Sequence, residues 1–263
     1  MTQSTITPKQ ETILKLIYRY RFVDTIQIQA FMGHKDKSRI GQWLKDLRQN
    51  SYIAWIYDPD NFTNKTKPAI YYLGINGIRH LRTLNAYPSA ELRKRYREAS
   101  RQPDFIARCV LIAGCCANLE APLSNTSYQY VVEADYIHPE SDYHFLEDLK
   151  PQLCFIKEII SKGSTTKKNY LLEIFDSSTP RYKLKQRLKG YVEYLDNGDW
   201  QDNFDSQPIV LIACPTKAAL IYAKRHVKSL LEDTTENIKQ SIRFSTLDTV
   251  RIKGVNSRIW EEI

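Results

Sequence analysis

Residues 37–73, KSRIGQWLKDLRQNSYIAWIYDPDNFTNKTKPAIYYL, decide the fold of the N-terminal part of the chain. Their first part, KSRIGQWLKDLRQNSYI (37–53), predicts a helix, because apolar residues recur there at helical spacing. Two short runs rich in β-branched and aromatic residues follow, at 52–57 and 69–73, and turn-forming residues separate them. The stretch therefore predicts a helix followed by a β-hairpin.

Two more helices are predicted before this stretch. Thr7 and Pro8 have the residue types of a helix start, while Asp24 and Gly33 are suited to begin and end a short second helix. Three short helices within about fifty residues indicate a helix-turn-helix core. With the hairpin and a closing helix from Asn76 onward, the order predicts a winged helix-turn-helix domain over residues 1–86.

The third helix is the expected recognition helix, since in this fold it lies in the major groove of DNA. Its apolar stripe centres on Ile40 and Leu47, and the opposite face is rich in donors and almost free of acid. The alternative is an ordinary solvated helix face. The DNA-binding residues that we expect on this helix and at the tip of the hairpin are Lys37, Ser38, Arg39, Gln42, Lys45, Arg48, Lys65 and Lys67.

Positive charge is concentrated in the first part of the chain. Residues 1–103 contain 18 Lys and Arg against 8 Asp and Glu, a net charge of +10, which leaves 20 against 22 for the rest. Such asymmetry favours a polyanionic partner for one domain. Residues 87–103 form the most basic piece, and we interpret them as a linker helix. Either Arg93, Lys94 and Arg95 make a second phosphate contact there, or the linker is a solvated connector.

From residue 104 to residue 263 the pattern changes to strands alternating with helices. This alternation predicts an α/β domain with a mixed sheet, so that the whole chain is of the α+β class. The helices that we expect here lie at 104–120, 180–195 and 217–231. The expected strands lie at 128–137, 153–158, 170–175, 208–214 and 242–246.

Several segments of the second domain, in their order, resemble the replication-relaxation family. They are KPQLCFI (150–156), YLLEIFDSST (170–179), KLKQRLKGYVEYL (183–195), IVLIACPT (209–216) and IRFSTLDTV (242–250). The resemblance implies a winged helix joined to a domain related to the PD-(D/E)xK nucleases. It also implies that the protein is carried by plasmids or integrative elements and serves replication or conjugative mobilisation.

The nuclease chemistry implied by that relationship needs two acids to hold Mg²⁺ and a lysine to assist the attacking water. At the matching positions the chain has Gln152, Glu173 and Phe175, so two of the three groups are missing. We therefore expect no catalytic residue, with Glu173 as a vestigial candidate. A structural role is the alternative use of Glu173, paired with Arg187 or Lys189 on the following helix.

Other function classes have little support. No phosphate-binding loop, HExxH or GxSxG pattern is present, and the five histidines have no metal spacing, so we expect no cofactor and no metal. The five cysteines lack zinc-ligand spacing and indicate reduced core residues in the cytoplasm. No apolar run is long enough to span a bilayer. Nearby acids offer the substitutes that an active nuclease would need: Glu133, Asp135 and Asp148.

The sequence thus favours a non-catalytic protein that binds double-stranded DNA. We expect an accessory factor or regulator of mobile-element replication or transfer, associated with plasmid or nucleoid DNA. Its second domain would serve as a scaffold for a homodimer or for other replication, transfer or transposition proteins. Two rival interpretations are a metal-dependent, sequence-targeted endonuclease and an interaction module of a larger DNA-processing complex with weak affinity for DNA.

Overall fold

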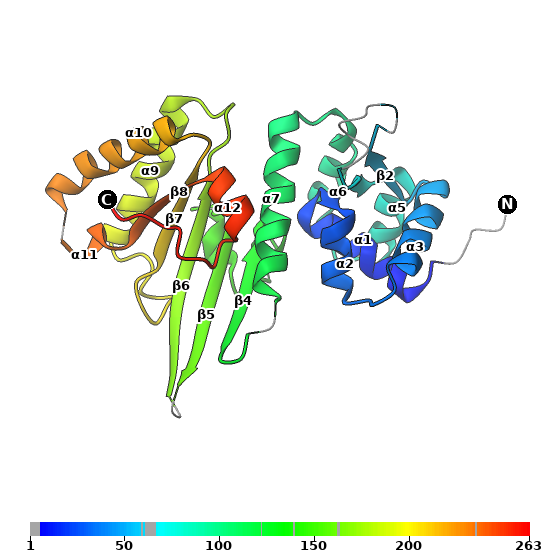
Figure 1. The fold of residues 1–263 in the computed structure, drawn as a ribbon, viewed down its shortest axis with the longest axis horizontal. Helices are drawn as coiled ribbons and strands as arrows, with labels where there is room; N and C mark the ends of the chain where they lie inside the picture. Colours follow the sequence, from blue (N-terminus) through cyan, green and yellow to red (C-terminus); the bar gives the residue numbers. More distant parts are fainter. Residues whose placement is uncertain are drawn as a thin grey trace. The chain divides into compact units, whose positions relative to one another are not determined.

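A computed structural model describes residues 6–58, 60, 67–121, 123–138, 140–161, 164–234 and 236–263. The fold is mixed α+β with one three-stranded and one five-stranded sheet in this part of the chain (Figure 1). The chain divides into two compact units, Met1–Ala113 and Gly114–Ile263. The helix α7, Pro103–Leu119, crosses the boundary between them.

The first unit has three helices, then a hairpin, then further short helices. Its strands form a small antiparallel sheet in the order β1-β3-β2, in which Val23 pairs with Tyr71. The two-residue strand β1 was not predicted, because it is too short to show a periodic pattern. The elements are α1 Pro8–Tyr20, β1 Val23–Asp24, α2 Thr25–Met32, α3 Lys37–Gln49, β2 Ile53–Ile56, β3 Ile70–Leu73, α5 Ile75–Thr83, α6 Ser89–Arg95 and the 3-10 turn Glu98–Ser100.

Side-chain caps fix where the first three helices begin. Thr7 and Asp24 each accept a hydrogen bond from the backbone N–H three residues on, in reciprocal capping boxes with a glutamine. Asp36 accepts from two backbone N–H groups at the start of α3. Gly33, at φ 57°, ends α2 in the left-handed region, which favours glycine. The predicted starts of α1 and α2 and the predicted end of α2 are therefore confirmed. The predicted third helix, 37–53, is too long, because α3 ends at Gln49 and Ile53 begins β2.

The stretch that we interpreted as a linker, 87–103, belongs to the first unit. Residues Ser89–Arg95 form α6, in which Leu92 is fully buried, and the turn after it buries Glu98. A solvated connector would expose such side chains. The division between the units falls after Ala113, within α7, rather than before residue 104.

The second unit is built on a mixed sheet with the strand order β4-β5-β6-β7-β8. Neighbours from β4 to β6 are antiparallel, and neighbours from β6 to β8 are parallel. The elements after α7 are β4 Thr126–Val132, α8 Glu133–Tyr136, the 3-10 turn His144–Glu147, β5 Leu153–Ser161, β6 Ser164–Ile174, α9 Arg181–Asp196, β7 Ile209–Cys214, α10 Lys217–Leu230, the 3-10 turn Leu231–Asp233, α11 Glu236–Lys239, β8 Ile242–Thr246 and α12 Leu247–Lys253.

Helices lie on both faces of this sheet. Figure 1 shows α9 and α10 on one face, and α12 with the end of α7 on the other. The larger core lies under α9 and α10 and includes Leu171, Leu188 and Ile212. The predicted strand 128–137 is too long, because the chain turns into α8 after Val132. The side chain of Asp135 accepts a hydrogen bond from the Val132 N–H at 2.9 Å, which favours a helical turn over a continued strand.

Candidate nucleic-acid interface

The helix α3 exposes a polar, basic face to solvent. Its opposite stripe, Ile40, Leu44 and Leu47, is at most 2% exposed, so packing on α1 and β2 fixes the rotation of the helix. Since the inward stripe is the predicted one, the predicted outward face is accessible to a partner. The predicted DNA-binding residues that the structure leaves exposed on this helix are Lys37, Ser38, Arg39, Gln42 and Lys45.

Cations gather at the first turn of α3. Lys37 and Arg39 lie where the partial positive charge of the helix dipole is concentrated, and Asp36 provides the carboxylate cap. Cations at this end do not stabilise a helix, because the dipole repels them. Helix stability therefore does not explain the position of these two exposed cations.

One acid, Asp46, lies at the edge of this face of α3. Asp46 is half-buried, and its Oδ1 atom accepts a hydrogen bond from Nε2 of Gln42 at 2.7 Å. The contact follows from the i,i+4 spacing of the two side chains on a helix. It orients the amide of Gln42 and places one negative charge beside it.

Arg48 joins α3 to the hairpin. Its guanidinium carbon lies 3.7 Å from the centre of the Trp55 ring on β2, a cation–π contact. Trp55 in turn lies 6.2 Å from Tyr71 on β3, centre to centre. Arg48 is therefore half-buried and holds the helix and the hairpin together.

The two lysines predicted at the tip of the hairpin have different outcomes. Lys67 is exposed beside β3. Lys65 lies outside the described residues. On α6, Arg93 is exposed, and Lys94 is half-exposed with its Nζ atom 2.5 Å from Oε1 of Glu91.

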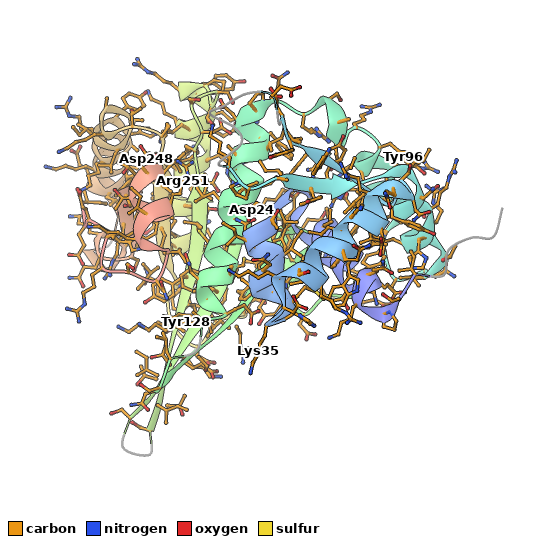
Figure 2. The ribbon with its side chains drawn as sticks, turned by 45° about the vertical axis from the view of Figure 1, so that its right-hand side comes forward. Asp24, Lys35, Tyr96, Tyr128, Asp248 and Arg251 are labelled. Carbon is orange, nitrogen blue, oxygen red and sulfur yellow. The ribbon has the colours of Figure 1, made fainter. Side chains whose placement is uncertain are left out.

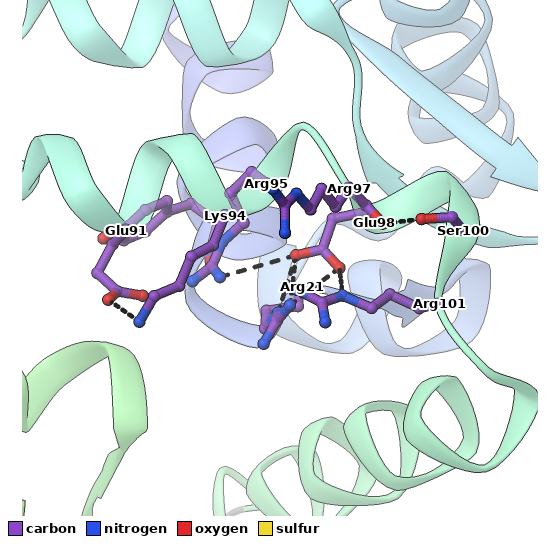
Figure 3. A network of polar contacts seen from close by, with 9 residues as sticks. Arg21, Glu91, Lys94, Arg95, Arg97, Glu98, Ser100 and Arg101 are labelled. Atoms are coloured by element: carbon purple, nitrogen blue, oxygen red, sulfur yellow. Dashed lines mark hydrogen bonds and ion pairs between the residues drawn. The ribbon is translucent and has the colours of Figure 1, made fainter.

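The prediction that Arg95 contacts DNA is wrong, because its side chain is 4% exposed. Figure 3 shows Arg95 beside Glu98, whose buried carboxylate also lies close to two other arginines. Arg21 donates to it at 2.9 and 3.1 Å, while Arg95 and Arg101 lie 3.7 and 3.4 Å away. Burial and the charge of Arg21 lower the pKa of Arg95, and the charge of Glu98 opposes them. This cluster ties α6 to the end of α1.

Glu173 on β6, the acid that the predicted nuclease resemblance retains, is 2% exposed, and both of its carboxylate oxygens accept hydrogen bonds. Its Oε1 atom accepts from Nε of Arg187 at 3.1 Å, and its Oε2 atom accepts from the Tyr191 hydroxyl at 2.7 Å. The predicted pairing with Arg187 is confirmed, while Lys189 pairs with Glu193 instead. Burial alone would lower the pKa of Arg187, but the hydrogen bonds and charge of Glu173 outweigh burial and raise it.

The other two nuclease positions have structural roles. Oε1 of Gln152 accepts a hydrogen bond from the Ile174 N–H at 2.7 Å, so this amide links the start of β5 to the end of β6. Phe175 is 2% exposed and belongs to the core under α9 and α10. Among the described residues, no group of three or more His, Cys, Asp or Glu side chains is arranged to hold a metal ion.

A family model described as replication-relaxation matches residues 14–209, about three quarters of the chain. The chain belongs to the replication-relaxation family. Membership suggests a role in the replication of mobile elements. A search of curated proteins and a search of solved structures each found no match.

The replication-relaxation match includes both the basic face of α3 with its hairpin and the surroundings of Glu173. It begins within α1 and ends at Ile209, the first residue of β7, so that it covers α3, the hairpin, Glu173 and Arg187. No helix in the described part of the chain has the length and apolar character needed to cross a membrane.

Proposed function

We propose that this replication-relaxation protein binds double-stranded DNA through α3 and the hairpin after it. One observation carries the proposal: α3 presents polar and cationic side chains outward over its first three turns while its apolar stripe is buried. In the proposed complex α3 lies in the major groove, where Arg39 and Gln42 reach base edges.

The hairpin supports interpreting the first unit as a winged helix. The strands β2 and β3 follow α3 directly and pair in register from Ile53–Leu73 to Ile56–Ile70. The Arg48–Trp55 contact fixes the hairpin relative to the helix, so that both approach one duplex together. Lys67 is exposed beside the hairpin, where a winged helix contacts the DNA backbone.

For the second unit we propose a nuclease-like fold without catalysis. The order helix, three antiparallel strands, helix, parallel strand, formed by α7, β4–β6, α9 and β7, supports the resemblance to PD-(D/E)xK nucleases. Gln152 and Phe175 replace an acid and a lysine, and Glu173 is bound by Arg187. The unit would serve as a scaffold for a second copy or a partner, in an accessory or regulatory factor of mobile-element replication or mobilisation.

The test is binding of a labelled duplex of random sequence, followed by fluorescence anisotropy over a series of salt concentrations. Affinity should fall steeply with salt, since phosphate neutralisation releases counterions. Replacing Lys37, Arg39 and Lys45 together by alanine should reduce the slope of log K against log salt by about 1.8, at about 0.9 for each of the phosphate contacts of Lys37 and Lys45.

The matched control removes three exposed lysines of the second unit, Lys183, Lys217 and Lys228. It changes the net charge equally and should leave the slope unchanged. Equal effects of the two triple variants would mean that α3 is not the contact, and the absence of any duplex binding would overturn the proposal. Cleavage of plasmid in Mg²⁺ that disappears with Glu173→Ala would overturn the non-catalytic role.

A further inference from the structure

A pocket of about 360 Å³ lies in the second unit, on the sheet face opposite α9 and α10. Its floor is formed by the five strands β4 to β8, and one wall is the C-terminal segment that follows α12. Figure 2 labels Tyr128 on β4, as well as Asp248 and Arg251 on α12, the helix that leads into this wall. Nothing in the proposed function of the first unit uses this pocket.

The strand register places like charges side by side in the pocket. Lys157 on β5 lies between two cross-strand neighbours. It is directly opposite Lys168 on β6 and directly opposite Tyr128 on β4. Two cations at opposed positions destabilise a sheet. Neither lysine has a carboxylate partner among the described residues, so the fold does not account for the pair, whereas a bound anion would.

Two more cations complete the basic lining. Arg258 lies on the C-terminal wall and is exposed, and Arg243 on β8 reaches Glu262 at 3.3 Å. The Nε atom of Arg243 is buried and has no hydrogen-bond partner in the described part of the chain. None of the described residues that line the pocket is acidic.

Aromatic rings lie among these cations. Phe155 and Tyr170 are opposite each other on β5 and β6 and stack with their centres 4.7 Å apart and their planes 10° apart. Tyr128 and Tyr170 are partly exposed. The indole N–H of Trp260 donates to the Val255 carbonyl oxygen at 2.9 Å, which fixes the ring on the C-terminal wall.

We propose that this pocket binds single-stranded DNA, with one nucleotide inside it. Cations that follow a phosphate backbone together with rings on which bases stack are the usual means of binding single strands. The volume is near the lower end of the range for small-molecule sites, which suits one nucleotide and excludes a duplex. The base stacks on the partly exposed rings of Tyr128 and Tyr170, and the phosphates lie towards the cations of the pocket.

The test uses the full chain carrying Lys37→Ala, Arg39→Ala and Lys45→Ala, so that the first unit contributes little. A labelled oligothymidylate is titrated and its anisotropy measured. Adding Lys157→Ala and Lys168→Ala should weaken binding about tenfold and reduce the salt slope by about 1.4, at about 0.7 per contact on single strands. Lys167→Ala is the matched control, because Lys167 adjoins Lys168 on the other sheet face and pairs with Glu158.

A second pair of variants tests stacking. Tyr128→Phe keeps the ring and should bind the strand as the parent does, while Tyr128→Leu should bind about tenfold more weakly. Thermal melting of every variant separates lost binding from lost folding. In the chain with intact α3, Lys157→Ala and Lys168→Ala should leave the affinity for duplex DNA unchanged. Failure of the single-strand proposal can therefore be distinguished from failure of the proposed function.

The absence of strand binding would overturn the proposal. So would equal affinity of the Lys157 and Lys168 double variant and its parent, or an equal loss with Lys167→Ala. Competition with thymidine monophosphate distinguishes the ligand sources. If the free nucleotide binds as tightly as the strand does, the pocket is a nucleotide site and the assignment to single strands is wrong.

Discussion

Nη2 of Arg187 lies 2.5 Å from Oε2 of Glu173, and Nη1 of the same guanidinium donates to the Leu149 carbonyl oxygen at 2.6 Å. One arginine of α9 thus holds β6 and the segment before β5 together. The Glu173 carboxylate, to which the nuclease resemblance assigns a metal ion, is thus part of this connection. The carboxylate also accepts a hydrogen bond from the buried hydroxyl of Tyr191.

Glu173→Ala should therefore destabilise the second unit. The substitution leaves the largely buried guanidinium of Arg187 without its counterion, and losing one partner of a buried pair costs about 3 kcal/mol. Urea unfolding followed by circular dichroism measures the loss. Combining Glu173→Leu with Arg187→Met removes both charges and should recover part of it. If the loss in the double variant equalled the sum of the losses in Glu173→Leu alone and Arg187→Met alone, the two side chains would not be coupled.

The elements whose signals are local were predictable from the sequence. Asp24 and Gly33 bound α2 because a cap and a left-handed glycine act within one turn of the helix. The expected strand at 242–246 matches β8, since apolar and polar side chains alternate along Ile242, Arg243 and Phe244. The pairing of Glu173 with Arg187 was predictable because the family resemblance placed the acid just before a basic helix.

Features that depend on tertiary contacts were not predictable. Arg95 has the same sequence environment as Arg93, and only the packing of α6 on α1 decides which of the two is buried. The strand β1 exists because β3 offers it a partner. The pocket in the second unit combines residues from β4 to β8 and the C-terminal segment, which the linear sequence keeps far apart.

Arg93→Ala and Arg95→Ala should separate binding from stability. Arg95→Ala removes a buried side chain that packs on the Tyr18 ring, while Arg21 still neutralises Glu98, so it should cost about 1 to 3 kcal/mol in the free energy of unfolding. Arg93→Ala changes an exposed side chain, so its cost should be within about 0.5 kcal/mol. Urea titration of both variants measures these values. A stable Arg95→Ala protein would contradict the structural role of the Glu98 cluster.

Asp46→Asn should strengthen duplex binding. The substitution removes a negative charge from the proposed contact face, while the asparagine oxygen still accepts the hydrogen bond from Gln42. Affinity at low salt should rise several-fold, and the gain should shrink at high salt because salt screens the charge. Asp199→Asn, an exposed site in the second unit, is the control for net charge. An equal gain in the control would remove Asp46 from the interface.

Substitutions on α3 and at the hairpin should differ in kind. Arg39→Ala and Gln42→Ala remove groups proposed to reach base edges, so both should relax sequence preference in a selection from random duplexes. Lys67→Ala removes a proposed phosphate contact and should weaken all duplexes alike. If the three variants change affinity without changing the selected sequences, α3 does not lie in the major groove as proposed.

The buried cysteines should make the protein sensitive to alkaline pH. Burial raises the pKa of Cys109, Cys115 and Cys154 to about 12, above the ordinary value of about 8.5 for an unfolded thiol. A raised folded pKa favours the protonated form, so the stability contribution is complete below the unfolded pKa and falls as pH rises above it. Each thiol should cost up to about 1.4 kcal/mol per pH unit between that value and about 12.

Urea unfolding at a series of pH values between 7 and 10 measures this loss. Cys115→Ala removes one such thiol, and it should make the decline in unfolding free energy shallower, whatever its effect at neutral pH. Iodoacetamide gives a second measurement, because the thiolate is the reactive form. All five cysteines are buried, so the folded protein should react slowly at pH 8 and the urea-unfolded protein quickly. Fast labelling of the folded chain would contradict both the burial and the raised pKa values.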